Sequence, residues 1–443
     1  MTIEKAEDTS AYPPSSVGWR AVSIFTILYI LSYADRKILS LMIIPIQNDL
    51  KISDFQFGLL QGFAFSLLYA LAGIPIGRLI DRYPRRWIMY TGVTFWSLAT
   101  ALSGFAQNFA SLFVARMSIG VGEATLSPAS YSMISDLFPK GKLSTALSVY
   151  GLGVSIGSSF AFLMGGTIIT LVAAADQIHL GWFGSFHAWQ IAFVIVGLPG
   201  LLLALLVFTI PEPRRMGLSK KDKMGPERGA VLKFMLERRS FLICHFGGFS
   251  AIGLMAFSVS SWAPAFYGRQ FGWTPFQIGI ALATYTGVFG TLGALVGGRL
   301  VDMFVRRGVE NAHLHVVAWS IACATPFGIA AFLSYSPMYS VAFLCIMNFF
   351  LMFFTGPGVG ALQLITPNEF RGQVSAIYLF VVSLVGLSVG PVAVGAITDF
   401  VFNDPTKVGW SVATLIGIGG VLAFTLLNLG RGPMLRALKA VGQ

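Results

Sequence analysis

Several ionisable residues lie inside long apolar stretches of the sequence. Asp35, Arg36 and Lys37 follow one another in the first stretch, and Glu123 lies in the fourth. Charged groups are costly in the middle of a membrane, so they mark functional sites where they occur. Each acid is about 15 residues into its stretch, which is about 20 Å along a helix and therefore close to mid-depth.

A buried carboxylate next to an arginine can exchange a proton. Loss of hydration disfavours the charged carboxylate, whereas a nearby guanidinium favours it. If Arg36 pairs in turn with a carboxylate and with an anionic substrate, the carboxylate takes up and releases a proton in step. We therefore expect Asp35 and Glu123 to be proton sites, and Arg36 and the two acids to bind the substrate. A structural ion pair that only cancels buried charge is the alternative interpretation.

Lys37 and a further basic residue, Arg116, are expected to support this site. Arg116 stands seven residues before Glu123, on the same helix face and about 10 Å along the axis. It either reaches Glu123 with both side chains extended or donates to backbone carbonyls of a neighbouring helix. Lys37 is expected near a polar neighbour or the outer interface. No His, Ser or Cys constellation accompanies the acids, and the three cysteines show no metal spacing, so we expect no catalytic residue, metal or cofactor.

The composition is that of a membrane protein. Of 443 residues, 55% are hydrophobic and 11% charged, and the mean hydropathy is +0.74, whereas soluble domains carry about 25% charge. Soluble enzymes, nucleic-acid readers and secreted disulfide scaffolds are thereby excluded. Backbone groups in lipid must be satisfied within their own segment, so each apolar stretch should be a helix. We expect an all-α protein with twelve transmembrane helices, near residues 20–48, 54–80, 86–106, 109–137, 143–174, 187–210, 239–268, 275–303, 313–335, 338–365, 371–401 and 409–430.

The distribution of Lys and Arg predicts the topology. Twenty-four of these thirty residues lie on one side of the expected helices, three on the other side and three within the membrane. By the positive-inside rule, both termini and the central loop are cytoplasmic. The compact chain and its short loops favour a bacterial inner membrane, and we expect a monomer. The expected parts are a tail over 1–19, a six-helix bundle over 20–210, a linker over 211–238, a second bundle over 239–430 and a tail over 431–443.

A repeated motif divides the chain into two related halves. Residues 77–86 read Gly-Arg-Leu-Ile-Asp-Arg-Tyr-Pro-Arg-Arg, and residues 298–307 repeat the Gly, Arg, Leu, Asp and both terminal Arg. Duplicated bundles with a cavity between them are a transporter architecture. Charged loops at one membrane face can clamp such halves, and small residues allow close helix approach. The residues expected to act in gating are Gly77, Asp81, Arg82, Arg85, Arg86, Asp136, Asp302, Arg306 and Glu369.

These motifs carry a family resemblance. The loop at 77–86 resembles the signature loop of the major facilitator superfamily, and residues 116–123 (Arg-Met-Ser-Ile-Gly-Val-Gly-Glu) are similar to its second motif, with Ile119 in place of the usual Gln. Tyr-Ala-Asp-Arg at 33–36 and Ile-Ser-Asp-Leu-Phe at 134–138 resemble the spinster family. The resemblance implies a fold of two six-helix bundles and transport of lysophospholipids or sphingosine-1-phosphate.

The residues and the resemblance together predict a proton-coupled secondary transporter of an amphipathic anionic lipid that works by alternating access. The expected partners are the substrate, protons and membrane lipids, without nucleic acid. An organic-anion/proton symporter of the same fold is the alternative, because such transporters also carry Gly-x-x-Glu on the fourth helix. A distant alternative is an intramembrane lipid-processing enzyme that uses Asp35 or Glu123 as acid or base. We expect no enzyme activity, and no nucleotide-binding loop is present.

Overall fold

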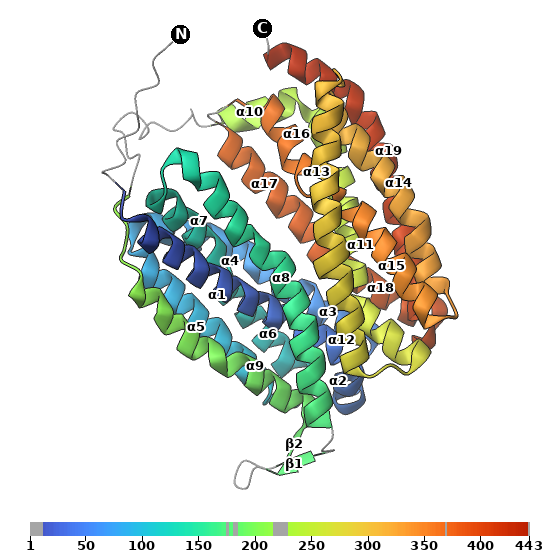
Figure 1. Cartoon of the computed structure of the whole chain (residues 1–443). Helices are drawn as coiled ribbons and strands as arrows, with labels where there is room; N and C mark the ends of the chain where they lie inside the picture. Colours follow the sequence, from blue (N-terminus) through green and yellow to red (C-terminus); the bar gives the residue numbers. More distant parts are fainter. Residues whose placement is uncertain (1–11, 174–176, 180–184, 216–228, 368–369, 442–443) are drawn as a thin grey trace. The chain divides into compact units, whose positions relative to one another are not determined.

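The computed structural model describes residues 12–173, 177–179, 185–215, 229–367 and 370–441. These residues are almost entirely helical (Figure 1), as the composition predicts. Eleven helices of the described part are long and apolar enough to cross a membrane. The remaining expected span, 86–106, coincides with α5 (Arg85–Ser103), which has two arginines in its first turn and several Ser and Thr residues. The expected twelve helices are therefore consistent with the eleven that pass on length and composition.

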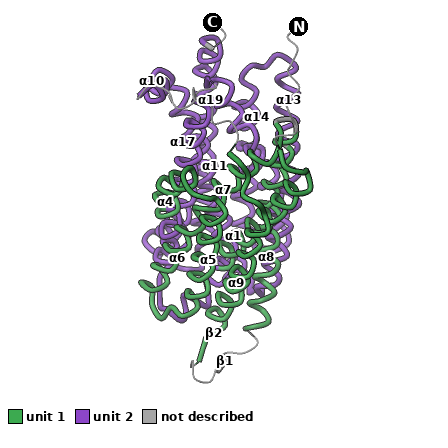
Figure 2. The backbone as a smooth tube through the Cα atoms, turned by 90° about the vertical axis from the view of Figure 1, so that its left-hand side faces the viewer, with its two compact units in different colours: residues 1–38, 67–223 green, residues 39–66, 224–443 purple. Residues whose placement is uncertain are grey.

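The chain forms two compact units, drawn in different colours in Figure 2. The first contains residues 1–38 and 67–223, and the second contains residues 39–66 and 224–443. Residues 39–66 cover the end of the first expected span and the start of the second, yet they belong to the same unit as the helices of the second half.

The first unit is built from long helices and one short hairpin. α5 packs along α9 and α6. At Gly197 of α9, an added Cβ would lie 2.5 Å from the backbone nitrogen of Ala101 in α5, so these two helices touch through their backbones. The elements are α1 (Ser15–Leu41), α4 (Phe63–Arg82), α5, α6 (Phe109–Glu123), α7 (Leu126–Leu137), α8 (Lys140–Ala173), β1 (Gln177–His179), antiparallel to β2 (Ser185–His187), α9 (Ala188–Leu205) and the 3-10 helix η3 (Leu206–Thr209).

The second unit has a core in which α11 and α14 both pack along α19. Its last helix continues through residues 431–441, where a tail was expected. Its elements are α2 (Ile43–Leu50), α3 (Asp54–Gln61), α10 (Ala230–Glu237), α11 (Arg239–Phe271), α12 (Pro275–Thr284), η4 (Tyr285–Gly290), α13 (Thr291–Arg306), α14 (Ala312–Leu333), α15 (Pro337–Leu351), η5 (Met352–Phe354), α16 (Pro357–Ile365), α17 (Arg371–Ser383), η6 (Leu384–Val389), α18 (Gly390–Ala396), η7 (Ile397–Phe402), η8 (Pro405–Lys407) and α19 (Val408–Val441).

The short helix α3 is fastened to α18. Ser53 caps α3 by accepting a hydrogen bond from the Gln56 backbone N–H, which fixes where the helix starts. An added Cβ at Gly58 would lie 2.6 Å from the carbonyl oxygen of Pro391, and one at Gly395 would lie 2.3 Å from that of Asp54. Only glycine permits this backbone-to-backbone crossing.

Candidate functional site

The fourth expected span is interrupted directly after Glu123. α6 ends at this residue and α7 begins at Leu126. Thr125 Oγ1 donates to the Gly122 carbonyl at 2.8 Å. Gly122 itself lets α6 lie against α5, since an added Cβ would be 2.7 Å from Trp96 Cβ. Glu123 is therefore the last residue of α6, and the close packing of Gly122 against α5 fixes its position.

Ser32 and Arg36 of α1 both reach Glu123. They are one helical turn apart and share a face. Ser32 Oγ donates to Glu123 Oε2 at 2.5 Å, and Arg36 Nε and Nη2 lie 2.7 Å and 2.6 Å from the same oxygen. The Glu123 side chain is fully buried and that of Arg36 is 17% exposed. Glu123 Oε1 has no hydrogen-bond partner among the described residues. One carboxylate oxygen thus receives all three donors, and the other receives none of them.

Asp35 is fully buried beside this pair, and its carboxylate has fewer hydrogen bonds than that of Glu123. Neither of its carboxylate oxygens makes a hydrogen bond to a described residue. Arg116, also buried, donates from Nη1 to the backbone carbonyl of Asp35 at 3.4 Å, so its contact with α1 includes a carbonyl, one of the two roles expected. A buried anion without hydrogen bonds is strongly disfavoured.

Two tyrosine rings lie close to the Arg36 guanidinium. Its guanidinium carbon is 5.3 Å from the ring centroids of both Tyr33 and Tyr69. Tyr29 stacks on Tyr150 with centroids 4.8 Å apart and ring planes within 7°. These tyrosines were not predicted as site residues, although the spacing of Tyr29 and Tyr33, one turn apart on α1, could have indicated them.

Lys37 lies away from the Arg36–Glu123 pair. Its Nζ is 5.7 Å from the centroid of the Phe162 ring on α8. The three consecutive charged residues of α1 therefore project in different directions, as a helix requires. Arg36 contacts Glu123, and Lys37 faces α8.

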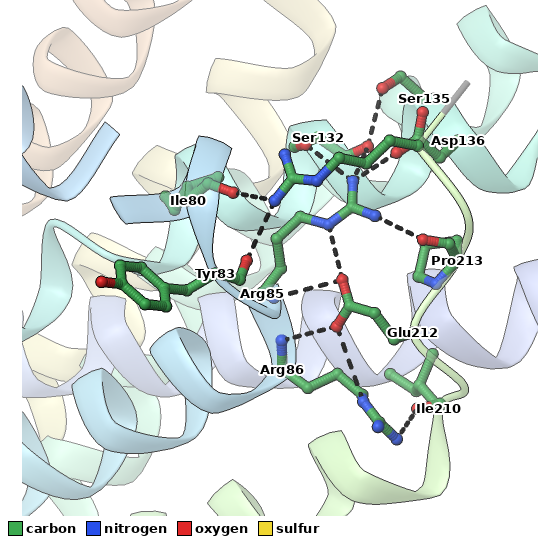
Figure 3. A network of polar contacts seen from close by, with 11 residues as sticks. Ile80, Tyr83, Arg85, Arg86, Ser132, Ser135, Asp136, Ile210, Glu212 and Pro213 are labelled. Atoms are coloured by element: carbon green, nitrogen blue, oxygen red, sulfur yellow. Dashed lines mark hydrogen bonds and ion pairs between the residues drawn. The ribbon is translucent and has the colours of Figure 1, made fainter. Parts of the chain in front are cut away.

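Arg85 and Asp136, two of the expected gating residues, meet in a buried network of the first unit (Figure 3). Arg85 is fully buried. Its Nη1 contacts Asp136 Oδ2 and donates to Ser132 Oγ at 2.9 Å. Its Nε donates to Glu212 Oε1 at 2.9 Å, and its Nη2 donates to the Pro213 carbonyl at 2.8 Å. The network joins α5, α7 and the segment after η3.

Glu212 is a central member of this network that the sequence did not indicate. Its two oxygens accept the backbone N–H groups of Arg85 and Arg86 at 3.2 Å and 3.1 Å, and a carboxylate is favourable at a helix N-terminus. Arg86 Nε lies 3.7 Å from Oε2. Arg215 donates to the carbonyls of Ile80 and Tyr83 at 2.5 Å and 3.0 Å (Figure 3). The start of the expected linker is therefore bound to the turn between α4 and α5.

The other expected gating residues are not gathered in such a network. Asp81 and Arg82 are exposed at the end of α4, and Asp302 and Arg306 are exposed at the end of α13. An added Cβ at Gly77 would meet no heavy atom of the described residues within 4 Å, so the close approach expected there is absent from this structure. Glu369 lies outside the described residues.

A second charged cluster, which we call the Asp54 cluster, lies in the second unit. Arg269 of α11 donates from Nη1 and Nη2 to the two carboxylate oxygens of Asp54 at 2.8 Å and 2.6 Å. Gln47 joins both partners, donating to Asp54 at 2.7 Å and accepting from Arg269 at 2.7 Å. Asp399 accepts the backbone N–H of Phe55 at 2.7 Å. Asp54 is buried, and a pocket of about 680 Å³ borders the cluster.

Comparison with known proteins identifies the class. The Major Facilitator Superfamily profile matches residues 25–391, and the chain belongs to this family. It is therefore a multi-pass integral membrane protein and a secondary transporter, not an enzyme. The solved bacterial homolog of the human lysosomal transporter Spinster, in an inward-facing and unoccupied conformation, superimposes with a TM-score of 0.78 at 24% identity, covering 96% of this chain and 98% of that one. That likeness shows the shared fold.

Spinster proteins are among the relatives within the family. The chain is 26% identical over 322 residues to Protein spinster of Drosophila melanogaster, a match that covers 70% of this chain and 51% of that protein. It is 29% identical over 386 residues to an MFS-type efflux pump of Mycolicibacterium smegmatis, covering 87% of this chain and 86% of that one.

Proposed function

We propose that this chain is a proton-coupled transporter of an amphipathic lipid with an anionic head, which it moves by alternating access. The observation that carries the proposal is the one-sided pairing of Glu123, whose Oε2 binds Arg36 and Ser32 while its Oε1 has no partner among the described residues. Such a carboxylate depends on one guanidinium for compensation of its charge.

Exchange of partners at Arg36 supplies the coupling. An anionic head that binds the Arg36 guanidinium competes directly with Glu123. Once released, Glu123 is a buried charge without a counter-ion, and it takes up a proton. The substrate and the proton are then bound in the same state of the protein and cross together.

Asp35 is the second proposed proton site. Both of its oxygens are buried without a hydrogen bond to any described residue, an environment that favours the neutral carboxyl group. Arg116 lies against the same turn of α1 through the Asp35 carbonyl. We propose that Arg116 keeps this turn in position and supplies a positive charge that limits proton uptake.

The tyrosine rings around Arg36 suit an amphipathic cargo. Aromatic faces accept apolar groups and flat cations, while phenol hydroxyl groups bond to polar heads. The chain resembles the spinster family in its motifs, and Protein spinster is among its relatives. This relationship supports an amphipathic lipid as the substrate. We propose Lys37, at the Phe162 ring, as a supporting residue at the edge of the site.

Alternating access requires contacts that form on one face and break on the other. We propose the Arg85 network, with Arg86, Asp136 and Glu212, as a brace that moves as one body. The exposed residues Asp81, Arg82, Asp302 and Arg306, together with Gly77 and Glu369, remain candidates for contacts formed in another state. We also propose the Asp54 cluster, whose residues all belong to the second unit, as a contact that forms in one state and breaks in another.

The proposed setting follows from the charge distribution. With 24 of its 30 Lys and Arg residues on one side, the chain fits a bacterial inner membrane with both termini and residues 211–238 in the cytoplasm. We propose that it works as a monomer, with bundles over 20–210 and 239–430.

The test is flux of labelled lysophosphatidylglycerol into liposomes that contain the purified protein, with and without an imposed pH gradient. Empty liposomes and Arg20→Gln, which alters an exposed residue, serve as controls. We expect lipid flux that increases with the gradient. Flux of small organic anions without lipid flux would support the organic-anion symporter in place of the lipid transporter.

A further inference from the structure

A basic pocket lies at the end of the second unit where α10 meets α11 and α19. Figure 1 shows α10 as a short helix near the end of α19 that carries the C-terminus. The pocket has a volume of about 330 Å³. It does not include any residue of the Arg36–Glu123 site. Its lining residues are Glu237, Arg238, Ser240, Phe241, Pro433, Arg436, Ala437 and Ala440.

The pocket is suited to an anion. Arg238, between α10 and α11, and Arg436 of α19 both line it. The single acid, Glu237, is 56% exposed and lies 3.5 Å from Arg238 Nη1. Arg238 Nε is buried and has no hydrogen-bond partner among the described residues. α11 begins at the pocket, and its cap residue Arg238 makes no side-chain capping bond. The N-terminal end of a helix attracts negative charge.

The Arg238 side chain is held in place before any ligand binds. Its guanidinium carbon lies 4.5 Å from the centroid of the Phe234 ring in α10. Phe234 is buried and packs against Phe370, with centroids 5.6 Å apart. An arginine stacked on an aromatic ring loses less freedom when it binds a phosphate.

The neighbouring surface of α10 is suited to acyl chains. Leu232 and Leu236, one turn apart, are 61% and 58% exposed, and Lys233 lies between them in sequence. Exposed leucines beside basic residues are typical of a helix that lies in a membrane interface, with its apolar face toward the acyl chains. In that position the basic pocket would lie at the depth of the lipid phosphates, and the leucines would contact the acyl chains.

We propose that this pocket binds the phosphate of an anionic phospholipid of the surrounding leaflet, as a bound lipid separate from the transported cargo. Arg238 and Arg436 hold the phosphate, and the headgroup displaces Glu237 from Arg238. Leu232 and Leu236 contact the acyl chains. The lipid thereby ties α10 to the ends of α11 and α19.

The experiment is native mass spectrometry of the full chain in detergent with added phosphatidylglycerol or, separately, phosphatidylcholine of the same chains. We expect phosphatidylglycerol to remain bound preferentially, and its retention to fall about tenfold in Arg238→Gln/Arg436→Gln. The control variant, Arg20→Gln/Arg307→Gln, removes the same charge from exposed positions and should retain the lipid. Arg238→Lys/Arg436→Lys keeps the charge and should recover part of the binding.

Three results would overturn the proposal. One is equal retention in the Arg238→Gln/Arg436→Gln and control variants. Another is equal retention of the two lipids by the unmodified chain. The third is full displacement of phosphatidylglycerol by millimolar inorganic phosphate, since a site for free anions does not need acyl chains. Size-exclusion chromatography of each variant separates loss of binding from loss of folding.

Discussion

Arg36 and Glu123 are joined at a single carboxylate oxygen, with Nη2 and Nε of the arginine 2.6 Å and 2.7 Å from Glu123 Oε2. Each residue comes from a different helix, and Glu123 stands at the point where α6 ends. The pair is buried on the carboxylate side and partly open on the guanidinium side. A ligand can therefore reach the arginine without first exposing the acid.

Removal of one partner should cost more than removal of both. Arg36→Gln leaves Glu123 buried without its cation, and we expect a loss of about 3–5 kcal/mol in unfolding free energy near neutral pH. Arg36→Gln/Glu123→Gln should recover most of this loss. Thermal unfolding in detergent measures the effect. Equal losses in the single and double variants would contradict the pairing.

Gly122 should be intolerant of a side chain. Gly122→Ala would place a Cβ 2.7 Å from Trp96 Cβ and 2.8 Å from the Trp96 backbone nitrogen. Because the backbone cannot yield easily, α6 must shift and carry Glu123 away from Arg36, at a cost of about 1–3 kcal/mol. We expect a large loss of substrate flux. Gly151→Ala is the matched control, since its Cβ would meet no described atom within 4 Å, and it should keep its stability.

Two arginines of one loop should differ sharply. Arg85 is fully buried in the network of Figure 3, whereas Arg82 is exposed. Arg85→Gln removes the guanidinium that contacts both Asp136 and Glu212, so we expect about 3–5 kcal/mol of destabilisation. Arg82→Gln should change unfolding by no more than about 0.5 kcal/mol. Similar melting shifts for the two variants would argue against the brace.

The Asp54 cluster can be tested with a double-mutant cycle. Asp54→Asn and Arg269→Gln remove the two ends of a two-contact ion pair, and we expect a coupling free energy above about 1 kcal/mol. The control cycle combines Asp54→Asn with Lys51→Gln, an exposed neighbour, and should give a value near zero. Coupling of the same size in both cycles would mean that Arg269 is not the specific partner of Asp54.

The helical fold could be predicted from apolar stretches, because membrane helices leave a strong one-dimensional signal. The depth of Asp35, Arg36 and Glu123 in a membrane stays a prediction. Which charged residues form ion pairs with each other could not be predicted from the sequence. Glu212 lies between two prolines in a basic segment, and nothing in its surroundings marks it as the counter-ion of Arg85. Asp54 and Arg269 are far apart in sequence, and each resembles an ordinary charge at a helix end.

The gating prediction shows the same difference between pattern and packing. The repeated motif singled out Arg82, Arg85 and Arg86 as a group. In the structure Arg85 is buried at the start of α5, whereas Arg82 is exposed at the end of α4. The interruption after Glu123 was not predicted either, because Ala124 and Thr125 do not break a helix by composition. In the structure, α6 ends where Gly122 packs closely against α5 and where Thr125 donates a hydrogen bond to the Gly122 carbonyl.

Proton uptake on substrate binding tests the central claim most directly. Purified protein in a weakly buffered solution would receive lysophosphatidylglycerol while a pH dye reports protons taken up. We expect about one proton per bound substrate in the unmodified chain, because Glu123 loses Arg36 and becomes neutral. Glu123→Gln should bind the lipid without taking up this proton. Uptake that is unchanged in Glu123→Gln, or absent from the unmodified chain although the lipid binds, would contradict the account.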